Sequence, residues 1–498
     1  VMSLQASSSL KQTPLDKRQA IKLLLKAVGG LLALLSLALL APFVMAVINA
    51  EKEQWTYLTL AIIGFVIGVA LFLQPVGDAK LRARQVFLLT TLCWVSASLF
   101  ATLPFIFAQP YLDFSSAWFE AMSAITTTGA TVISGLDDLP SSVLLWRAML
   151  QWLGGIGIIV MAMAILPFLQ VGGMRLFQAE SSDMSGKFMP RSSHMVLAIG
   201  RVYLILTVAV IALYLLGGMK SFDAFVHGMT TIGTAGFSNY DASFGHFSDT
   251  PFLVITGTLF MVAGALPFVL YIRALKGDYE PLWKDTQVRA FVTFLMIAIA
   301  LITLVQVVKG REFGDALMHT AFNVVSVVTT TGYATEDYGN WGSWSLMVFF
   351  YLMFIGGCTG STAGGMKIFR FQLSQLLLKK QFSQLIHPNL VRVETYQERR
   401  VNDSLLGSMV AFCFMYFLLI AVIALGLSLF DLDFLTAISG AASAVGNVGP
   451  GLGEIIGPAG NFSSLDGGAK LLLIFAMLAG RLEIMTVLIL FHRHYWKH

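Results

Sequence analysis

The stretch Ser123-Ala-Ile-Thr-Thr-Thr-Gly129 recurs three more times along the chain, each time with a Ser or Thr six residues before a glycine. The other copies are Thr230-Thr-Ile-Gly-Thr-Ala-Gly236, Ser326-Val-Val-Thr-Thr-Thr-Gly332 and Ser443-Ala-Val-Gly-Asn-Val-Gly449. The glycines are 107, 96 and 117 residues apart, so the repeating unit is about one hundred residues long. A spacing that returns at a fixed period indicates an internal repeat. We therefore expect four related units in one polypeptide.

The composition is that of a membrane protein. Of the 498 residues, 56% are hydrophobic and only 12% are charged, and the mean hydropathy is +0.76. A soluble domain carries about 25% charged residues, whereas a helix that crosses a bilayer needs about 20 apolar residues. Ten segments meet this requirement: 21–49, 55–75, 85–108, 145–170, 195–218, 250–274, 288–308, 343–376 (interrupted), 405–430 and 468–491. The sequence thus predicts an all-α polytopic membrane protein with ten membrane helices.

Shorter semi-apolar segments of 12–18 residues lie between these spans, and each ends in one of the four glycine stretches. They are too short to cross a bilayer, so we expect re-entrant pore helices. Non-helical backbone survives at membrane depth only where protein or water covers it, so the four loops must face one another. We expect four pseudo-repeated helix–pore-loop–helix units around one pore, preceded by two extra N-terminal helices. The predicted divisions are 1–80 for the N-terminal segment and extra helices, then 81–180, 181–285, 286–400 and 401–498 for the four repeats.

The distribution of charge predicts the orientation. With the N-terminus in the cytoplasm, all but seven of the 32 Lys and Arg residues lie on the cytoplasmic side, as the positive-inside rule requires. Both termini are then cytoplasmic. Acidic residues gather on the outer side, where they would raise the local cation concentration, unless they are ordinary solvated loop charges. The candidates for this acidic mouth are Asp113, Asp137, Asp138, Glu336, Asp337 and Glu454.

The four loops have the chemistry of a cation filter. Glycine adopts positive φ and lets carbonyl oxygens approach an ion closely, and converging loops of carbonyls can replace the water around a dehydrated cation. Threonine hydroxyls before the glycines could also orient a cation. The alternative is that these glycines only pack helices together. The candidate filter residues are Thr127, Thr128, Gly129, Thr234, Ala235, Gly236, Thr330, Thr331, Gly332, Asn447, Val448 and Gly449.

A second distinctive stretch, Gly356-Gly-Cys-Thr-Gly-Ser-Thr-Ala-Gly-Gly-Met-Lys367, interrupts the eighth span. Five glycines and three hydroxyl residues in twelve positions do not hold an uninterrupted lipid-facing helix. We expect an unwound segment beneath the filter that acts as a mobile gate, or alternatively a kinked packing helix. The candidate gate residues are Gly356, Gly357, Cys358, Thr359, Gly360, Ser361, Thr362, Ala363, Gly364, Gly365 and Lys367, together with Arg481.

Arg481 lies well inside the segment 468–491. An ionisable residue at membrane depth is costly and is functional by default. Arg481 would repel cations below the filter or brace the glycine-rich segment by hydrogen bonds; a structurally paired arginine is the alternative. Glu483 is two residues further on, hence on another helix face, and is a doubtful partner.

The sequence offers little for catalysis. The three cysteines, Cys93, Cys358 and Cys413, lie in apolar or glycine-rich spans, without metal-ligand spacing. No nucleophile–base signature is visible, and a membrane enzyme would need convergent His, Asp or Glu residues at one membrane face. We therefore expect no enzyme, no cofactor bound by this chain and no nucleic-acid partner.

Taken together, these residues resemble the Trk/Ktr/HKT superfamily of potassium transporters over nearly the whole chain. The two helices before the repeats are similar to those of the bacterial Trk membrane subunit. The resemblance implies that K⁺ binds at Gly129, Gly236, Gly332 and Gly449, that residues 356–367 form an intramembrane gate loop and that Arg481 lines a constriction. Glycine at position 129, where some sodium-permeable relatives carry serine, favours K⁺. Asn447, Val448 and Pro450 depart from the family's simpler loop pattern.

The resemblance also implies a homodimer in the cell inner membrane and a cytoplasmic regulatory subunit that binds nucleotide. The basic stretch from Lys367 to Arg400 is a candidate docking surface, although positive-inside bias alone would also explain it. The function we expect is potassium uptake through a gated K⁺-selective pore. The alternative is a K⁺/Na⁺ or K⁺/H⁺ symporter, which needs a titratable or second-ion site in the spans, and none is obvious.

Overall fold

The computed structural model describes residues 17–76, 83–169, 192–388, 395–397, 399–401 and 403–496, and this part of the chain is almost entirely helical. Within it, the only paired strands are β1 (Thr395–Tyr396) and β2 (Arg399–Arg400), which form a short antiparallel hairpin. Lys80, Arg82 and Lys497, part of the predicted positive side, lie outside the described residues. The predicted all-α fold is confirmed.

Seven helical spans of the described part are long and apolar enough to cross a bilayer, and bent helix pairs raise this number to nine. All of them except Ser141–Met161 carry exposed large apolar side chains, as lipid-facing helices do. The seven are α1 (Lys17–Ala38) with α2 (Leu40–Ile48), α3 (Gln54–Phe72), α4 (Ala83–Phe107), α6 (Ser141–Leu169), α8 (Ser192–Leu216), α13 (Thr286–Val308) and α17 (Asp403–Ser428).

Two predicted spans are not continuous helices. The segment 250–274 is split into α10 (Pro251–Gly264) and α11 (Phe268–Ala274), which meet at 98°. Pro267 stands at this break, where its missing N–H and fixed φ end a helix. The segment 468–491 is split into α19 (Gly467–Arg481) and α20 (Met485–Leu488), with a bend of 110° that includes the following turn to Phe491.

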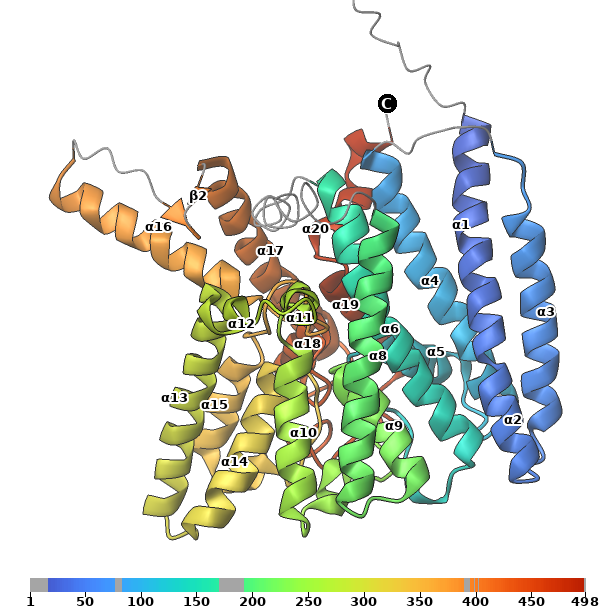
Figure 1. The fold of residues 1–498 in the computed structure, drawn as a ribbon, viewed down its shortest axis with the longest axis horizontal. Helices are drawn as coiled ribbons and strands as arrows, with labels where there is room; N and C mark the ends of the chain where they lie inside the picture. The colour runs from blue at the N-terminus through green and yellow to red at the C-terminus, as the bar shows by residue number, and fades with distance from the viewer. Residues whose placement is uncertain are drawn as a thin grey trace, which may run out of the picture.

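The eighth predicted span, 343–376, is divided as expected. It consists of α15 (Ser343–Leu352), a glycine-rich loop over residues 353–367, and α16 (Ile368–Ile386). Figure 1 shows α16 leaving the bundle at a steep angle rather than continuing the direction of α15. The shorter connecting elements are α12 (Glu280–Lys284) and the 3₁₀ turns η1 (Leu136–Asp138), η2 (Ser243–Phe247), η3 (Tyr338–Trp341), η4 (Ile489–Phe491) and η5 (Arg493–Tyr495).

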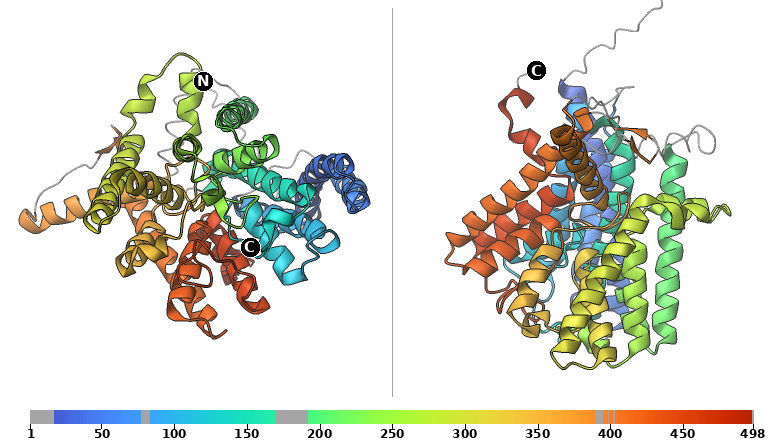
Figure 2. Two further views of the ribbon diagram at one scale, coloured as in Figure 1. Left: turned by 90° about the horizontal axis from the view of Figure 1, so that it is seen from below. Right: turned by 90° about the vertical axis from the view of Figure 1, so that its left-hand side faces the viewer.

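Four short helices lie inside the bundle where the sequence predicts re-entrant segments. They are α5 (Phe114–Ile125), α9 (Ser221–Ile232), α14 (Phe313–Val328) and α18 (Phe434–Gly446). Seen from below in Figure 2, the helices gather around a common centre. The helices α1 and α3 pack against each other at one edge, outside this arrangement. The start of α1 and the C-terminal turns lie at the same end of the bundle (Figure 1).

Candidate functional site: a ring of four glycines

The four short helices end in the same way. The residue two before each glycine, Thr127, Thr234, Thr330 or Asn447, has a left-handed backbone with φ of 54°, 46°, 56° and 54°. The next residue donates its N–H to the carbonyl of the repeated Ser or Thr: Thr128 to Ser123 (2.9 Å), Ala235 to Thr230 (3.0 Å), Thr331 to Ser326 (2.8 Å) and Val448 to Ser443 (2.9 Å). This pairing is a Schellman motif. The recurring spacing in the sequence therefore reflects one kind of helix ending, which is repeated four times.

The glycine that follows also has positive φ in every loop: 82° at Gly129, 77° at Gly236, 86° at Gly332 and 113° at Gly449. Each of these glycines faces the neighbouring loop so closely that a Cβ atom would collide with a backbone carbonyl oxygen. Those carbonyls belong to Ala235 for Gly129, Thr331 for Gly236, Val448 for Gly332 and Thr128 for Gly449. The contacts run from loop one to two, three, four and back to one. They close a cycle, which we call the glycine ring.

All twelve candidate filter residues are thus brought to one place in the structure. Most of their threonine hydroxyls, however, are engaged with protein: Thr128 with Thr126 (2.8 Å) and with the Asn447 amide (3.0 Å), and Thr331 with Thr329 (2.8 Å). The hydroxyl of Thr127 has no hydrogen-bond partner among the described residues. That these hydroxyls orient a cation stays a prediction. The backbone carbonyls are the oxygens that the loops bring together between neighbours.

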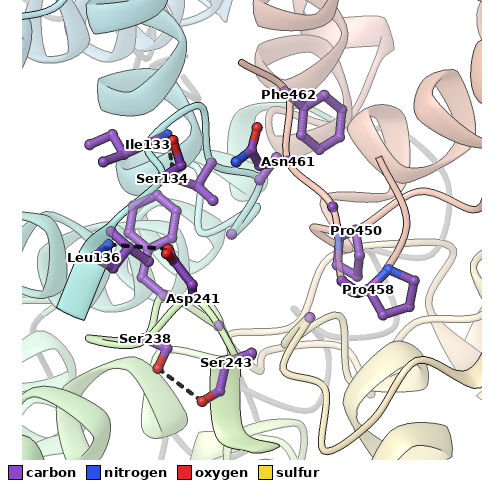
Figure 3. Close-up of a pocket in the computed structure, with 18 of the residues that line it drawn as sticks. Ile133, Ser134, Leu136, Ser238, Asp241, Ser243, Pro450, Pro458, Asn461 and Phe462 are labelled. Carbon is purple, nitrogen blue, oxygen red and sulfur yellow. Dashed lines mark hydrogen bonds between the residues drawn. The ribbon is translucent and has the colours of Figure 1, made fainter. Parts of the chain in front are cut away.

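A cavity of about 240 Å³ opens onto one face of the ring (Figure 3). Gly129, Gly236, Gly332 and Pro450 line it, and Asp241 is its only lining carboxylate among the described residues. Asp241 accepts hydrogen bonds from the backbone amides of Gly135 (2.8 Å) and Leu136 (3.1 Å), and so ties the first two repeats together. Asp241 lies outside the sequence patterns that predict the site.

None of the six acidic residues predicted for the mouth lines this cavity. Asp113 and Asp337 cap the starts of α5 and η3, and Asp137 accepts from the amide of Asp241 (3.1 Å). Glu336 forms an ion pair with Arg311. This ion pair, with a further contribution from Asp315, raises the pKa of the Arg311 guanidinium. Several of the expected mouth charges therefore have local structural partners.

The glycine-rich loop is folded against the opposite side of the ring and contacts three of its four loops. Gly364 donates its N–H to the hydroxyl of Thr330 (2.6 Å), and Gly365 donates to the carbonyl of Gly446 (2.7 Å). The hydroxyl of Thr234 donates to that of Thr362 (3.0 Å). The loop is thus tied to filter positions of the second and third repeats and to the helix end of the fourth.

The same loop also supplies hydrogen-bond partners for the backbone groups that are left free at the break between α10 and α11. Cys358 and Thr362 donate their N–H groups to the carbonyls of Ala265 (2.9 Å) and Gly264 (3.2 Å), and Phe268 donates to the carbonyl of Gly360 (3.0 Å). Backbone groups freed inside a membrane must find such partners within the protein. The break in the sixth predicted span and the glycine-rich loop are therefore one structural unit.

Arg481 stands at the last turn of α19 rather than in mid-helix, and only 4% of it is exposed. Its Nη1 donates to the carbonyl of Thr362 (2.9 Å), so it braces the glycine-rich loop as predicted. Its Nε and Nη2 have no hydrogen-bond partner among the described residues. Glu483 pairs with Arg370, which agrees with the doubt about Glu483 as a partner of Arg481.

A small cavity of about 50 Å³ lies beside Arg481, Lys367, Glu483 and the glycine-rich loop. This is enough space for one or two water molecules. Lys367 is directed back onto the loop, where its Nζ donates to the carbonyl of Ala363. The space between the glycine-rich loop and Arg481 is therefore small.

Gln151 is a second site residue that the sequence analysis missed. Its Nε2 donates to the carbonyl of Ala235 (2.6 Å) and its Oε1 accepts from the amide of Phe237 (3.0 Å), so it holds both sides of Gly236. A glutamine inside a largely apolar span was the available signal, because polar side chains in membrane helices find partners inside the protein.

Four short helices that carry backbone carbonyls to a closed ring inside an apolar bundle define a membrane transport protein for ions. Residues 53–497 match the TrkH family, described as a cation transport protein. The chain therefore belongs to the TrkH family of cation transport proteins, not to a family of enzymes. The resemblance noted from the sequence is confirmed.

The relatives cover nearly the whole chain. The Trk system potassium uptake protein TrkI of Halomonas elongata is 48% identical over 475 residues, which is 95% of this chain and 96% of the relative. The Trk system potassium uptake protein TrkH of Vibrio parahaemolyticus is 36% identical over 484 residues, or 95% and 99%. The crystal structure of the potassium transporter TrkH from Vibrio parahaemolyticus superposes with a TM-score of 0.89 at 34% identity, over 97% of this chain and 100% of that one.

Proposed function

We propose that this protein takes up potassium ions across the cell inner membrane through the glycine ring. The observation that carries the proposal is the closed cycle of close contacts between filter glycines and neighbouring carbonyls. Such a ring offers an entering cation oxygen atoms in place of its hydration shell. The relatives described above are named as potassium uptake proteins, which supports K⁺ as the ion.

In this proposal the ion is bound at Gly129, Gly236, Gly332 and Gly449, with the two residues before each glycine completing the filter. One glycine per loop is common to all four loops, so we expect few ion sites and modest selectivity. The hydrogen bonds from Gln151 to the second loop support a preformed ring, because they fix the backbone on both sides of Gly236. A preformed ring costs the ion less reorganisation than a mobile one.

The glycine-rich loop and Arg481 form the proposed gate. The loop closes the lower side of the ring through Thr330, Gly446 and Thr234, and Arg481 holds it from below through Thr362. Opening requires these bonds to break together. The glycines at 356, 357, 360, 364 and 365 favour such a change, because glycine visits backbone conformations that other residues avoid.

We further propose the four-repeat division with boundaries at 81, 181, 286 and 401, ten membrane crossings and cytoplasmic termini. The start of α1 and the C-terminal turns lie at the same end of the bundle (Figure 1), which supports placing both termini on the same side of the membrane. From the family resemblance we also propose that the protein forms a homodimer and binds a cytoplasmic nucleotide-binding subunit. The stretch 367–400 is the proposed docking surface; within it, Lys379 and Lys380 lie on α16, and residues 389–394 are outside the described part.

The experiment that tests this function is a flux assay on the purified protein in lipid vesicles with K⁺, Rb⁺, Na⁺ and Li⁺. We expect K⁺ and Rb⁺ to pass faster than Na⁺ and Li⁺. Gly129→Ser should lower this preference, because its side chain meets the carbonyl of Ala235. Gly135→Ser is the matched control, since Gly135 also has positive φ (74°) but has open space around its missing side chain. Equal passage of K⁺ and Na⁺ in the parent would refute the selective pore.

A further inference from the structure

The position nine residues before each ring glycine has a common property in three of the four repeats. It is occupied by Glu120, His227, Asn323 and Gly440 in chain order. The first three are polar, lie on the short helices α5, α9 and α14, and are completely buried. A buried polar side chain is costly unless all its groups find partners, so the partners of these three are informative.

Glu120 holds the segment that leaves the first ring loop. Its carboxylate accepts from the backbone amide of Val132 (2.9 Å) and from the hydroxyl of Thr131 (3.0 Å), which lie three and two residues after Gly129. The guanidinium of Arg147 neutralises it through Nε (2.8 Å). Because the pair is buried and electrically balanced, Glu120 does not act as a cation attractor in the mouth.

His227 and Asn323 make the equivalent contacts in the second and third repeats. The Nε2 of His227 hydrogen-bonds to the hydroxyl of Ser238 (3.0 Å), two residues after Gly236. Asn323 accepts from the amide of Thr335 (3.2 Å) and donates to its hydroxyl (2.9 Å), three residues after Gly332. Chemically different side chains therefore perform the same task at the same register of the repeat.

The fourth repeat lacks this side chain. A side chain at Gly440 would meet Ile456, with its Cβ only 3.0 Å from the Cδ1 atom. The neighbouring Ser439 takes over part of the task, because its hydroxyl accepts from the amide of Leu452 (2.9 Å), three residues after Gly449. The fourth loop is thus held by a shorter group from a different helix position.

We propose that Glu120, His227 and Asn323 are positioning residues that set the ion selectivity of the glycine ring. Gly129, Gly236 and Gly332 each lie between two fixed points. One is the Schellman bond before the glycine, and the other is the contact with one of these side chains two or three residues after it. A backbone fixed at both ends cannot turn its carbonyl or widen the ring to suit a cation of another size. Selectivity by backbone oxygens depends on how firmly they are held, as well as on their number.

This inference rests on the proposed potassium transport but is tested separately. The test variant is Asn323→Leu, which keeps the branching at Cγ and removes both bonds to Thr335. The control is Thr320→Val, on the same helix and equally buried, because the Thr320 hydroxyl bonds to Gln306 (2.6 Å) on α13 and not to a ring loop. The ratio of K⁺ to Na⁺ flux is measured in vesicles, with thermal unfolding in detergent measured in parallel.

We expect Asn323→Leu to lower the flux ratio by about threefold to tenfold, the effect of one or two net hydrogen bonds, and Thr320→Val to leave the ratio unchanged. Unchanged ratios in a folded Asn323→Leu protein would overturn the inference, as would equal losses in both variants, since a general loss of packing would then explain them. A parent that does not prefer K⁺ refutes the proposed function instead, before any variant is compared.

If Asn323→Leu does not fold, Glu120→Gln provides the same test. Glutamine has the same shape but only one oxygen, so it cannot accept from Thr131, Val132 and Arg147 together. We expect the flux ratio to fall while transport of K⁺ itself persists. A folded Glu120→Gln protein with the parent's ratio contradicts a positioning role.

Discussion

The hydroxyl of Thr330 accepts a hydrogen bond from the backbone amide of Gly364, over 2.6 Å. Thr330 is the residue with left-handed backbone that follows α14, and Gly364 belongs to the glycine-rich loop. The residue that shapes the ring on one side therefore holds the proposed gate on the other. The ring and the glycine-rich loop share this residue, which couples the position of the loop to the conformation of the ring.

Removal of this hydroxyl should loosen the gate. We expect Thr330→Ala to raise basal K⁺ or Rb⁺ flux by about twofold to tenfold, because one net hydrogen bond of the closed state is lost. Thr330→Ser keeps the hydroxyl and is the control; its flux should stay near that of the parent. The measurement is tracer Rb⁺ uptake into vesicles at equal protein content. If the alanine and serine variants conduct alike, the bond does not contribute to closure.

We propose two separable roles for Arg481: repulsion of cations by its charge, and bracing of the loop through Thr362. A buried positive charge within a few ångströms of the ion path opposes a cation by several kcal/mol. We therefore expect Arg481→Gln to increase flux at least about tenfold, while Arg481→Lys, which keeps the charge, stays close to the parent. Flux of both variants is compared at one membrane potential. Equal increases would show that the bond to Thr362 matters and the charge does not.

The glycine ring was predictable because one local structure is repeated. The Schellman ending fixes the distance between Ser123 and Gly129, and the same distance recurs in each unit. The spacing of residues in the sequence therefore predicts this helix ending directly. The four short helices were also predictable, since apolar segments of their length are too short for a full crossing.

The breaks in two spans were not predicted, because hydropathy measures composition and not direction. Pro267 was a signal for the first break, but its consequence depends on Cys358 and Gly360, which lie about ninety residues further on and supply the missing hydrogen bonds. The second break, after Arg481, contains no proline, and Glu483 adopts a left-handed backbone there (φ 60°). Its ion pair with Arg370 is a tertiary contact that no local pattern predicts.

Two glycines of α6 provide a test of packing around the ring. A side chain at Gly154 would collide with the carbonyl of Ile125, at the end of the first pore helix, whereas a side chain at Gly157 meets nothing within 4 Å. We expect Gly154→Ala to destabilise the protein by about 1–3 kcal/mol through overpacking. Gly157→Ala should be neutral or stabilising by up to about 1 kcal/mol, since alanine is the better helix former.

The measurement is thermal unfolding of both variants in the same detergent, followed by Rb⁺ flux. Because Gly154 supports the helix that leads into Thr127 and Gly129, its variant should also lose flux. Similar unfolding temperatures for the two variants would show that α6 can move away from the pore helix without cost.

The cap of the first pore helix predicts a dependence of stability on pH. Asp113 accepts from the amides of Ser115 (3.0 Å) and Ser116 (3.2 Å). Partial burial raises the pKa of Asp113, but the hydrogen bonds from Ser115 and Ser116 outweigh it and lower the pKa to about 2. A carboxylate whose pKa is lower in the folded state stabilises fully above its unfolded pKa, near 4, and this contribution disappears as the pH falls towards 2.

We therefore expect Asp113→Ala to cost about 1 kcal/mol at neutral pH, as loss of a helix cap does. The difference in unfolding temperature between this variant and the parent should be constant from about pH 7 to 5 and should shrink below about pH 4. Asp113→Asn retains a capping oxygen without titrating, so its stability relative to Asp113→Ala should stay constant over the whole range. A gap between parent and alanine variant that is as large at pH 3 as at pH 7 would mean that the ionised carboxylate is not what stabilises the start of α5.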